Sequence, residues 1–237
     1  MRTAVVTGGS SGLGLEFVRR LLRGGARVVA GSRRAESSEA LARLKSEHED
    51  RLTVHRLDVG DRDSREAFGR RVSETLERLD VLVNAAGIIA GDEERISVFG
   101  ALDQEELART FLINSIAPLM MTELLHPLLE RGEHPIVVNI SSLNGSIASW
   151  DRPGKYSYCA SKAALNMITK TLSVELKDAG IRVVAFHPGW VKTWMTRDEP
   201  APMEPEESVA GMLRVMDSLT LDGSGRFLDW RGREVPW

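Results

Sequence analysis

The segment TAVVTGGSSGLG, residues 3–14, joins a short apolar run to a glycine-rich turn. Its first five residues are apolar or β-branched, as in a strand that is buried on both faces. Gly8, Gly12 and Gly14 follow with G-x-x-x-G-x-G spacing, and a helix is predicted to begin at about Leu13. Glycines permit a tight turn and let a pyrophosphate approach the backbone, while the helix N-terminus supplies free N–H groups. The segment therefore predicts a strand, a turn and a helix around a dinucleotide, although a ligand-free turn would use the same glycines.

Short β-branched runs recur along the chain, and they predict further buried strands at 26–31, 52–57, 80–84, 135–140, 181–186 and 225–230. Helical patterns lie between these runs. Two of them carry capping-box spacing, from Asp63 to Glu66 and from Asp103 to Glu106. The alternation predicts one α/β domain over residues 1–237, with a doubly wound, Rossmann-type, mostly parallel seven-stranded sheet and helices on both faces.

Composition excludes several classes of function. The chain has 31 basic and 34 acidic residues, a formal charge of −3, which gives no electrostatic case for binding nucleic acid or an anionic membrane. Cys159 is the single cysteine, so an intramolecular disulfide and a multi-cysteine metal site are both excluded, and we predict no metal site. No apolar run approaches the roughly 18 residues of a transmembrane helix, and the first residues do not resemble a signal peptide. We therefore expect a cytoplasmic protein.

The end of the second predicted strand indicates which dinucleotide binds. An NAD site usually places an acid there, about 20 residues beyond the glycines, to hold the ribose 2′-hydroxyl. Here Ser32 is followed by Arg33 and Arg34, and the first acid is Glu36. Because a guanidinium pair suits a phosphate dianion, we predict NADP(H) in preference to NAD(H). The alternative is a pair of solvated surface arginines.

The stretch YSYCASK, residues 156–162, holds both tyrosines of the chain and one lysine. Residues four apart lie on one face of a helix, so Tyr158 is beside Lys162, whereas Tyr156 has only Ala160 at that offset. A tyrosine hydroxyl can donate a proton to a carbonyl oxygen, and a nearby ammonium is expected to lower its pKa from about 10. The pair predicts an acid/base couple, although an aromatic residue beside a solvated lysine would have the same spacing.

A third group should polarise the substrate oxygen from the carboxyl end of the fifth predicted strand, where doubly wound sheets bind ligands. The segment IVVNISS ends there in Ser141 and Ser142, and Ser146 follows shortly after. Asn114 lies within the helical pattern TFLINSIAPLM, where a buried amide is unfavourable unless it is hydrogen-bonded. It is either a functional residue or a satisfied core asparagine.

The order of these motifs resembles that of the short-chain dehydrogenase/reductase family over essentially the whole chain. The matching motifs are TGGSSGLG at 7–14, NAAG at 84–87, Asn114, ISS at 140–142, YCASK at 158–162 and HPGWVKT at 187–193. Three longer segments, beginning at Ser141, Ala185 and Ser224, are similar to the C-factor/Sniffer-like subgroup of carbonyl reductases. The resemblance implies an NADP(H)-dependent oxidoreductase that transfers a hydride between nicotinamide and a carbonyl or alcohol.

The resemblance also implies roles for individual residues. The catalytic set would be Asn114, Ser142, Tyr158 and Lys162, with Asn114 binding a water that links Lys162 to solvent. Ser142 lies 16 residues before Tyr158, a long interval that keeps Ser141 and Ser146 as alternatives. The cofactor would contact Gly8, Ser10, Ser11, Gly12, Leu13, Gly14, Arg33, Asp58, Val59, Asn84, Ala85, Ala86, Gly87, Tyr158, Lys162, Pro188, Gly189, Val191 and Thr193. His187 and Cys159 are expected to be structural.

Substrate identity is usually encoded in the loops above the sheet, here residues 88–101, 143–155 and 190–206. Trp150, Trp190, Trp194, Met195 and Met203 lie in these loops and favour an apolar carbonyl substrate, unless the tryptophans cover the core or a subunit interface. The family resemblance implies a homodimer or homotetramer. A dinucleotide-binding signalling or regulatory protein on the same fold is the alternative, since fold does not fix function.

Overall fold

The computed structural model describes residues 1–89, 97–197 and 199–237. Seven strands form one sheet in the order β3-β2-β1-β4-β5-β6-β7, and all neighbouring strands are parallel. The strands are β1 (Thr3–Thr7), β2 (Arg27–Ser32), β3 (Leu52–Arg56), β4 (Val81–Asn84), β5 (Ile136–Ile140), β6 (Arg182–His187) and β7 (Arg226–Asp229). The doubly wound parallel sheet is therefore confirmed, with each strand at its predicted place.

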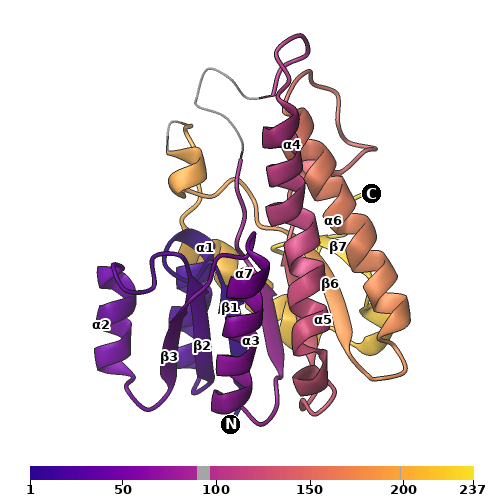
Figure 1. Cartoon of the computed structure of the whole chain (residues 1–237). Helices are drawn as coiled ribbons and strands as arrows, with labels where there is room; N and C mark the ends of the chain where they lie inside the picture. Colours follow the sequence, from indigo (N-terminus) through magenta and orange to yellow (C-terminus); the bar gives the residue numbers. More distant parts are fainter. Residues whose placement is uncertain (90–96, 198) are drawn as a thin grey trace.

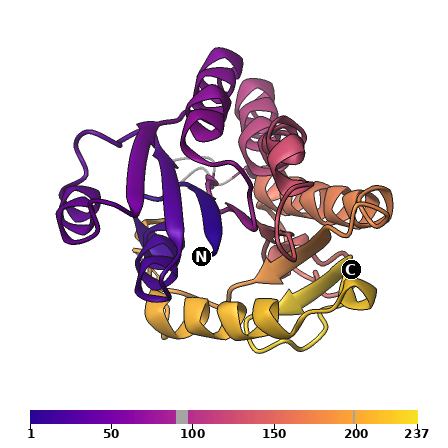
Figure 2. The ribbon, with the colours of Figure 1, turned by 90° about the horizontal axis from the view of Figure 1, so that it is seen from below.

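Helices cover both faces of this sheet (Figures 1 and 2). Those in the first half are α1 (Gly12–Arg23), α2 (Glu39–Glu47), α3 (Arg62–Thr75) and α4 (Gln104–Phe111). Those in the second half are α5 (Ala117–Leu129), α6 (Tyr156–Glu175) and α7 (Pro205–Ser218). In Figure 2, α1 and α7 lie on one side of the sheet, and α3, α5 and α6 lie on the other.

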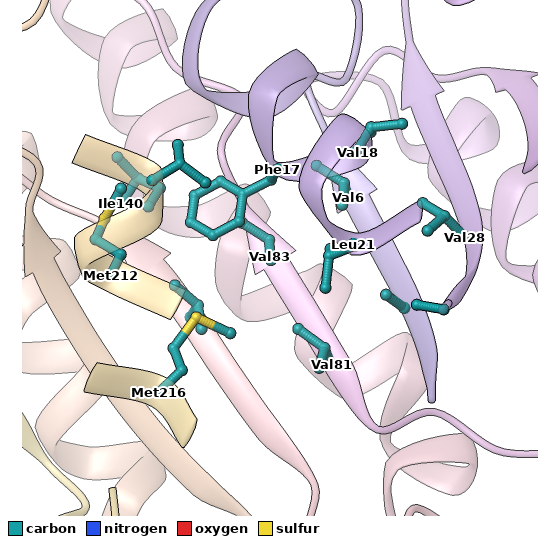
Figure 3. Packing of buried hydrophobic residues seen from close by; sticks show 14 of the residues in the cluster. Val6, Phe17, Val18, Leu21, Val28, Val81, Val83, Ile140, Met212 and Met216 are labelled. Carbon is teal, nitrogen blue, oxygen red and sulfur yellow. The ribbon is translucent and has the colours of Figure 1, made fainter. Parts of the chain in front are cut away.

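Successive side chains of a strand point to opposite faces of the sheet, so the core consists of two clusters. Val6, Val28 and Val83 point to the face that α1 and α7 cover, where Phe17, Leu21, Met212 and Met216 pack against them (Figure 3). The intervening strand residues, Val5, Val29 and Leu82, point the other way and pack with residues of α3, α5 and α6. Both faces are therefore apolar, as a parallel sheet between two helical layers requires.

The helix starts confirm the predicted N-cap at Asp103 and correct the one at Asp63. The Asp103 side chain accepts a hydrogen bond from Glu106 N at 2.8 Å, as expected for the start of α4. The expected start at Asp63 is wrong, because α3 begins two residues earlier and Asp61 accepts from Ser64 N at 2.7 Å. Glu66 pairs instead with Arg62, one turn away.

A continuous helical stretch, Gln104–Leu129, consists of α4, a π-helical turn η1 (Leu112–Ile116) and α5. Its most apolar 18 residues have a mean hydropathy of 1.2, which would suit a membrane span, but 56% of them are buried within the fold. Asn114 lies in the π-helical turn. The stretch therefore behaves as a core helix with a local widening at one polar residue.

The β1–α1 turn is fixed by steric contact. A Cβ on Gly14 would lie 2.3 Å from the carbonyl oxygen of Gly8. A Cβ on Gly8, at φ +70°, would lie 2.9 Å from the backbone of Ala86, which follows β4. The turn can therefore close only with glycine at these positions, and it lies directly against the chain that leaves β4.

We predict that Gly14→Ala destabilises the protein by about 1–3 kcal/mol, the usual cost of overpacking, because the added methyl would collide with a main-chain oxygen. The matched control is Gly24→Ala, where the added methyl would find its nearest neighbours at 3.5 Å. Denaturant unfolding should show a free energy within about 0.5 kcal/mol of wild type for the control. Equal stability of the two variants would contradict this account of the turn.

Candidate functional site

The site begins at the carboxyl ends of β1 and β4, where the glycine turn meets two other segments. Gly8 adjoins Ala86, and a Cβ on Gly12, at φ +52°, would lie 3.4 Å from the Thr193 side chain. Ser11 is the exposed N-cap residue of α1 and makes no capping hydrogen bond. The turn therefore combines close backbone approach with a helix N-terminus, a combination that fits a pyrophosphate.

A hydroxyl cluster lies beside the turn at the end of β2. Ser32 Oγ donates to Ser10 Oγ at 2.7 Å, and the Ser38 hydroxyl donates to the carbonyl oxygen of Ser10 at 3.4 Å. Arg33 and Arg34 are exposed, and Arg34 N donates to Ser32 Oγ at 3.1 Å. Ser32 and Ser38 were not among the predicted cofactor contacts. The position of Ser32 at the end of a predicted strand could have indicated a contact there.

The predicted cofactor contacts after β3 and at the end of β4 differ in where their side chains point. Asp58 is half-buried after β3 and its Oδ1 accepts from Gly60 N at 3.0 Å, while Val59 is buried. Asn84 ends β4, but its Nδ2 donates to Asn139 Oδ1 at 2.9 Å in the sheet interior. The pleat thus turns the Asn84 side chain inward, so that its predicted contact with a cofactor would be made by its main chain.

The small residues Ala85, Ala86 and Gly87 continue from β4 across the crevice, and all three are half-buried. A Cβ on Gly87 would lie 3.3 Å from Asn114 Oδ1, 3.7 Å from Lys162 Nζ and 3.7 Å from Met195 Cε. This glycine therefore lies where three distant parts of the chain converge. With no side chain, Gly87 leaves its Cα open to close approach by a cofactor.

Tyr158 and Lys162 lie on one face of α6, with Lys162 Nζ 5.7 Å from the centre of the Tyr158 ring. The ammonium donates to the carbonyl oxygen of Ile140 at 2.7 Å, at the end of β5. Burial lowers the pKa of Lys162 to about 8. The lysine is therefore held by the strand end and by its own helix rather than by solvent.

The Tyr158 phenol differs from expectation. Burial raises its pKa to about 12, and a hydrogen bond with the Ser142 side chain opposes that rise. The expected lowering by the Lys162 ammonium is thus wrong for the protein alone, because desolvation is the largest cause and the ammonium is directed at Ile140. The raised pKa keeps the phenol in its neutral form near neutral pH.

The geometry distinguishes the three candidate serines. Ser141 Oγ is buried and donates to Asn166 Oδ1 at 2.6 Å, on the helical side of the strand end. Ser146 Oγ is also buried and donates to the carbonyl oxygen of Pro236 at 2.6 Å. Ser142 is half-buried and accepts from Asn144 N at 3.2 Å, and its side chain acts on the Tyr158 phenol, whose pKa it lowers against the effect of burial. Of the three serines, Ser142 is the one brought to the tyrosine.

Asn114 is fully buried and connects the site to the chain after Gly87. Its Nδ2 donates to Ile88 O at 2.8 Å and to Ser161 Oγ at 3.0 Å, while its Oδ1 accepts from Ile88 N at 2.9 Å. Ser161 in turn donates to the carbonyl oxygen of Tyr158 at 2.8 Å. Asn114 therefore joins the β4 end to α6, and Ser161 is a partner that sequence reasoning missed.

The segment after β6 lies on the other side of the glycine turn, where Thr193 approaches Gly12. Pro188 and Gly189 are half-buried and Val191 is buried, before Thr193 reaches Gly12. His187 Nδ1 accepts from Leu143 N at 3.2 Å, and burial lowers its pKa to about 4. A neutral histidine in this position supports the turn after β5, which agrees with the structural role expected for it.

The predicted substrate loops surround these groups. Of residues 88–101, residues 90–96 lie outside the described part of the chain, and within 190–206 the same is true of residue 198. The last loop is shorter than expected, because Pro205 is the first residue of α7. Within the described ranges, no group of three or more His, Cys, Asp or Glu side chains is placed to hold a metal ion.

Comparison with known proteins agrees with this geometry. Residues 2–204 match the short chain dehydrogenase family. The chain is 42% identical to C-signal of Myxococcus xanthus over 159 residues, which are 67% of this chain and 93% of that protein.

Solved structures extend the similarity to the whole chain. An NADPH-bound carbonyl reductase from chicken fatty liver has a TM-score of 0.91 and 35% identity, covering 100% of this chain and 99% of that one. The carbonyl reductase Sniffer of D. melanogaster has a TM-score of 0.92 and 29% identity, with 100% of both chains covered. With its seven-stranded parallel sheet and its glycine turn, the chain belongs to the short-chain dehydrogenase family of oxidoreductases and is similar to the carbonyl reductases within it.

Proposed function

We propose that the protein is an NADP(H)-dependent carbonyl reductase in which Tyr158 is the acid/base, Ser142 holds the substrate oxygen, and Lys162 and Asn114 complete the site. The observation that carries the proposal is the convergence of Ser142, Tyr158 and Lys162, with Lys162 beside Gly87 at the end of β4. Residues 1–237 would act as one dinucleotide-binding and catalytic domain. A cytoplasmic location would suit the free thiol of Cys159.

When bound, the nicotinamide supplies the hydride for reduction or accepts it for oxidation. Tyr158, with a pKa of about 12, donates its proton to the oxygen that becomes the alcohol. Ser142 donates a hydrogen bond to the same oxygen and so polarises the carbonyl. The raised pKa keeps the phenol protonated near neutrality in the protein alone, so the proton that reduction requires is in place.

Lys162 and Asn114 would support this proton transfer. The Lys162 ammonium is held at Ile140 and faces the space beside Gly87, where it can bind a ribose hydroxyl. Asn114 uses both amide hydrogens within the protein, and its Oδ1 accepts from Ile88 N. An amide oxygen has two acceptor sites, so one could take a water that links Lys162 to solvent.

The preference for NADP(H) rests on the end of β2. Arg33 and Arg34 are exposed there beside the hydroxyls of Ser10 and Ser32. Guanidinium groups bind a phosphate dianion with charge-assisted hydrogen bonds, and hydroxyls add further donors. No acid occupies this strand end to hold a free 2′-hydroxyl in the way an NAD site does.

The proposed substrate is an apolar ketone or aldehyde. Large apolar side chains are exposed around the site, including Ile147 at 78%, Trp194 at 67% and Trp190 at 46%. Exposed apolar patches of this kind mark ligand grooves or interfaces. Apolar residues on the long helices, Ile116, Met167 and Val174, are also exposed, and we propose that they pair in a homodimer or homotetramer.

A second candidate is a dinucleotide-binding signalling protein, which the similarity to C-signal favours. A sensor would need the glycine turn and the arginines, but it would not need the Ser142–Tyr158 hydrogen bond. The presence of both sets of groups supports an enzyme, and the first experiment below separates the two candidates.

We expect Tyr158→Phe to lower kcat for reduction of an apolar ketone by about a hundredfold or more, because it removes the proton donor and keeps the ring. The Kd for NADPH should stay within about twofold, since the hydroxyl is not the main source of cofactor affinity. Tyr156→Phe is the matched control and should retain wild-type turnover. A Tyr158→Phe variant with most of the wild-type kcat would contradict the proposed role.

Arg33→Ala should raise the KM for NADPH by about tenfold to a hundredfold, the usual effect of losing a charge-assisted hydrogen bond, with NADH affected little. Steady-state kinetics with both cofactors measure the change. Arg43→Ala, at an exposed arginine of α2, is the control. Similar kcat/KM for the two cofactors, unchanged in Arg33→Ala, would refute the preference.

The lowered pKa of Lys162 predicts a pH-dependent stability. Its pKa of about 8 lies below the ordinary 10.5, so burial of the charge is most costly below pH 8 and the cost fades as pH rises to 10.5. Lys162→Met should therefore be more stable than wild type by about 2–3 kcal/mol at pH 7, and the difference should shrink above pH 8.

Unfolding of the cofactor-free protein at several pH values tests this, with Lys170→Met as the control at an exposed lysine of the same helix. The control should differ from wild type by less than about 0.5 kcal/mol at every pH. A stability difference for Lys162→Met that stays constant from pH 7 to pH 10 would show that the lysine is not desolvated as described.

A further inference from the structure

The segment that follows β7 folds back along this strand. Trp230–Gly232 form the turn, and residues 233–235 return antiparallel, with Leu228 bridged to Glu234. Asp229 N donates to Arg233 O and Val235 N donates to Phe227 O, both at 2.8 Å. The Asp229 carboxylate accepts from Arg231 N and Arg233 N at 2.9 Å each and from Arg233 Nε at 2.7 Å. The returning segment is therefore firmly hydrogen-bonded to the edge strand.

Two side chains attach the segment to the core. Val235 is 8% exposed and packs with Ala185 and Phe227. The Trp237 ring stacks on Phe227, with 5.7 Å between centroids and an interplanar angle of 25°. Aromatic pairs of this kind add stability beyond the area that they bury. Pro236 and Trp237 therefore have a fixed position against β7.

From that position, the segment binds the loop that follows β5. Ser146 Oγ, in a residue 1% exposed, donates to Pro236 O at 2.6 Å. Ala148 N donates to Trp237 O at 2.9 Å, and Ser149 N donates to Ser146 Oγ at 3.2 Å. The bonds to Pro236 and Trp237 join residues about 90 positions apart in sequence, and Ser146 is only four residues beyond Ser142.

The near end of the same loop is fixed by other groups. Leu143 N donates to His187 Nδ1 at 3.2 Å, and Asn166 Nδ2 donates to Gly145 O at 3.1 Å. A Cβ on Gly145 would lie 2.8 Å from the backbone of Lys162, so the turn Leu143–Gly145 is in direct contact with α6. The loop is thus held by β6 and α6 at one end and by residues 236 and 237 at the other.

We propose that Pro236 and Trp237, through Ser146 and Ala148, position Ser142 beside Tyr158 and hold Ile147 at the substrate entrance. The segment that follows β7 is thus a positioning element of the active site, although none of its residues touches the reacting atoms. Ile147 lies between the two anchored residues and is 78% exposed, so the same bonds that hold Ser142 also set part of the rim of the site.

The catalytic part of this inference rests on the proposed function, but the anchoring part does not. Ser146 has two bonding partners in the segment, Pro236 O at 2.6 Å and Trp237 O at 3.4 Å. Removing its hydroxyl leaves those carbonyls in place and breaks the link, together with the bonds that Ser146 Oγ makes to Ser149 within the loop. Removing the Trp237 ring leaves its carbonyl in the chain and breaks the attachment to Phe227. The two variants therefore break the same connection from opposite sides.

The first measurement is hydrogen–deuterium exchange of residues 143–150 in the cofactor-free protein, which needs no activity. Ser146→Ala and Trp237→Ala should each speed exchange of this loop about tenfold or more, while exchange of the central strands stays at the wild-type rate. Trp237→Phe should restore slow exchange because it keeps a stacked ring. Ser218→Ala is the control, since its exposed hydroxyl donates only within α7, to Val215 O. Wild-type exchange in both anchor variants would overturn the anchoring.

The second measurement is steady-state reduction of an apolar ketone by NADPH. Both anchor variants should lose about tenfold to a hundredfold in kcat with the KM for NADPH within about twofold, because misplacement of a catalytic group by 1 Å has an effect of this size. Trp237→Phe should recover most of kcat. Faster loop exchange with unchanged kcat would refute the positioning role. If wild type reduces no carbonyl, the proposed function fails, and the exchange result still decides the anchoring.

Discussion

The parallel pairing of β1 with both β2 and β4 is the constraint on which the rest of the structure depends. The chain leaves β1 through α1 on one face of the sheet and reaches β4 through α3 on the other face. The segments that follow β1 and β4 therefore diverge from adjacent strand ends, which is where doubly wound sheets bind ligands. The close approach of Gly8 to Ala86 holds these two segments against each other at the strand ends.

Polar groups are buried at this edge at a cost in stability, and nearly all of them have partners. Ser161 links Asn114 to Tyr158, and Lys162 donates to the carbonyl oxygen of Ile140. Burial nevertheless raises the pKa of Tyr158 and lowers the pKa of Lys162, because desolvation disfavours the charged form of each group. The shared cause is exclusion of water, which also strengthens every hydrogen bond to a substrate oxygen placed there.

Much of this could be predicted from sequence because it depends on local patterns. The strands follow from β-branched runs, and the shared face of Tyr158 and Lys162 follows from helix geometry. The inward turn of Asn84 and the different environments of Ser141 and Ser142 depend on the pleat of the folded sheet. The link between Ser146 and Pro236 joins segments 90 residues apart, so no local pattern could reveal it. The raised pKa of Tyr158 likewise required knowledge of its burial.

The most direct test of the central claim is transfer of deuterium from NADPH, labelled on its nicotinamide ring, to a panel of apolar ketones and aldehydes. Mass spectrometry of the products would detect the label on the carbon that bears the new hydroxyl. The convergence of Ser142, Tyr158 and Lys162 at the strand ends predicts labelled alcohol from at least one member of the panel. Tight binding of NADPH with no label transferred to any member would contradict it.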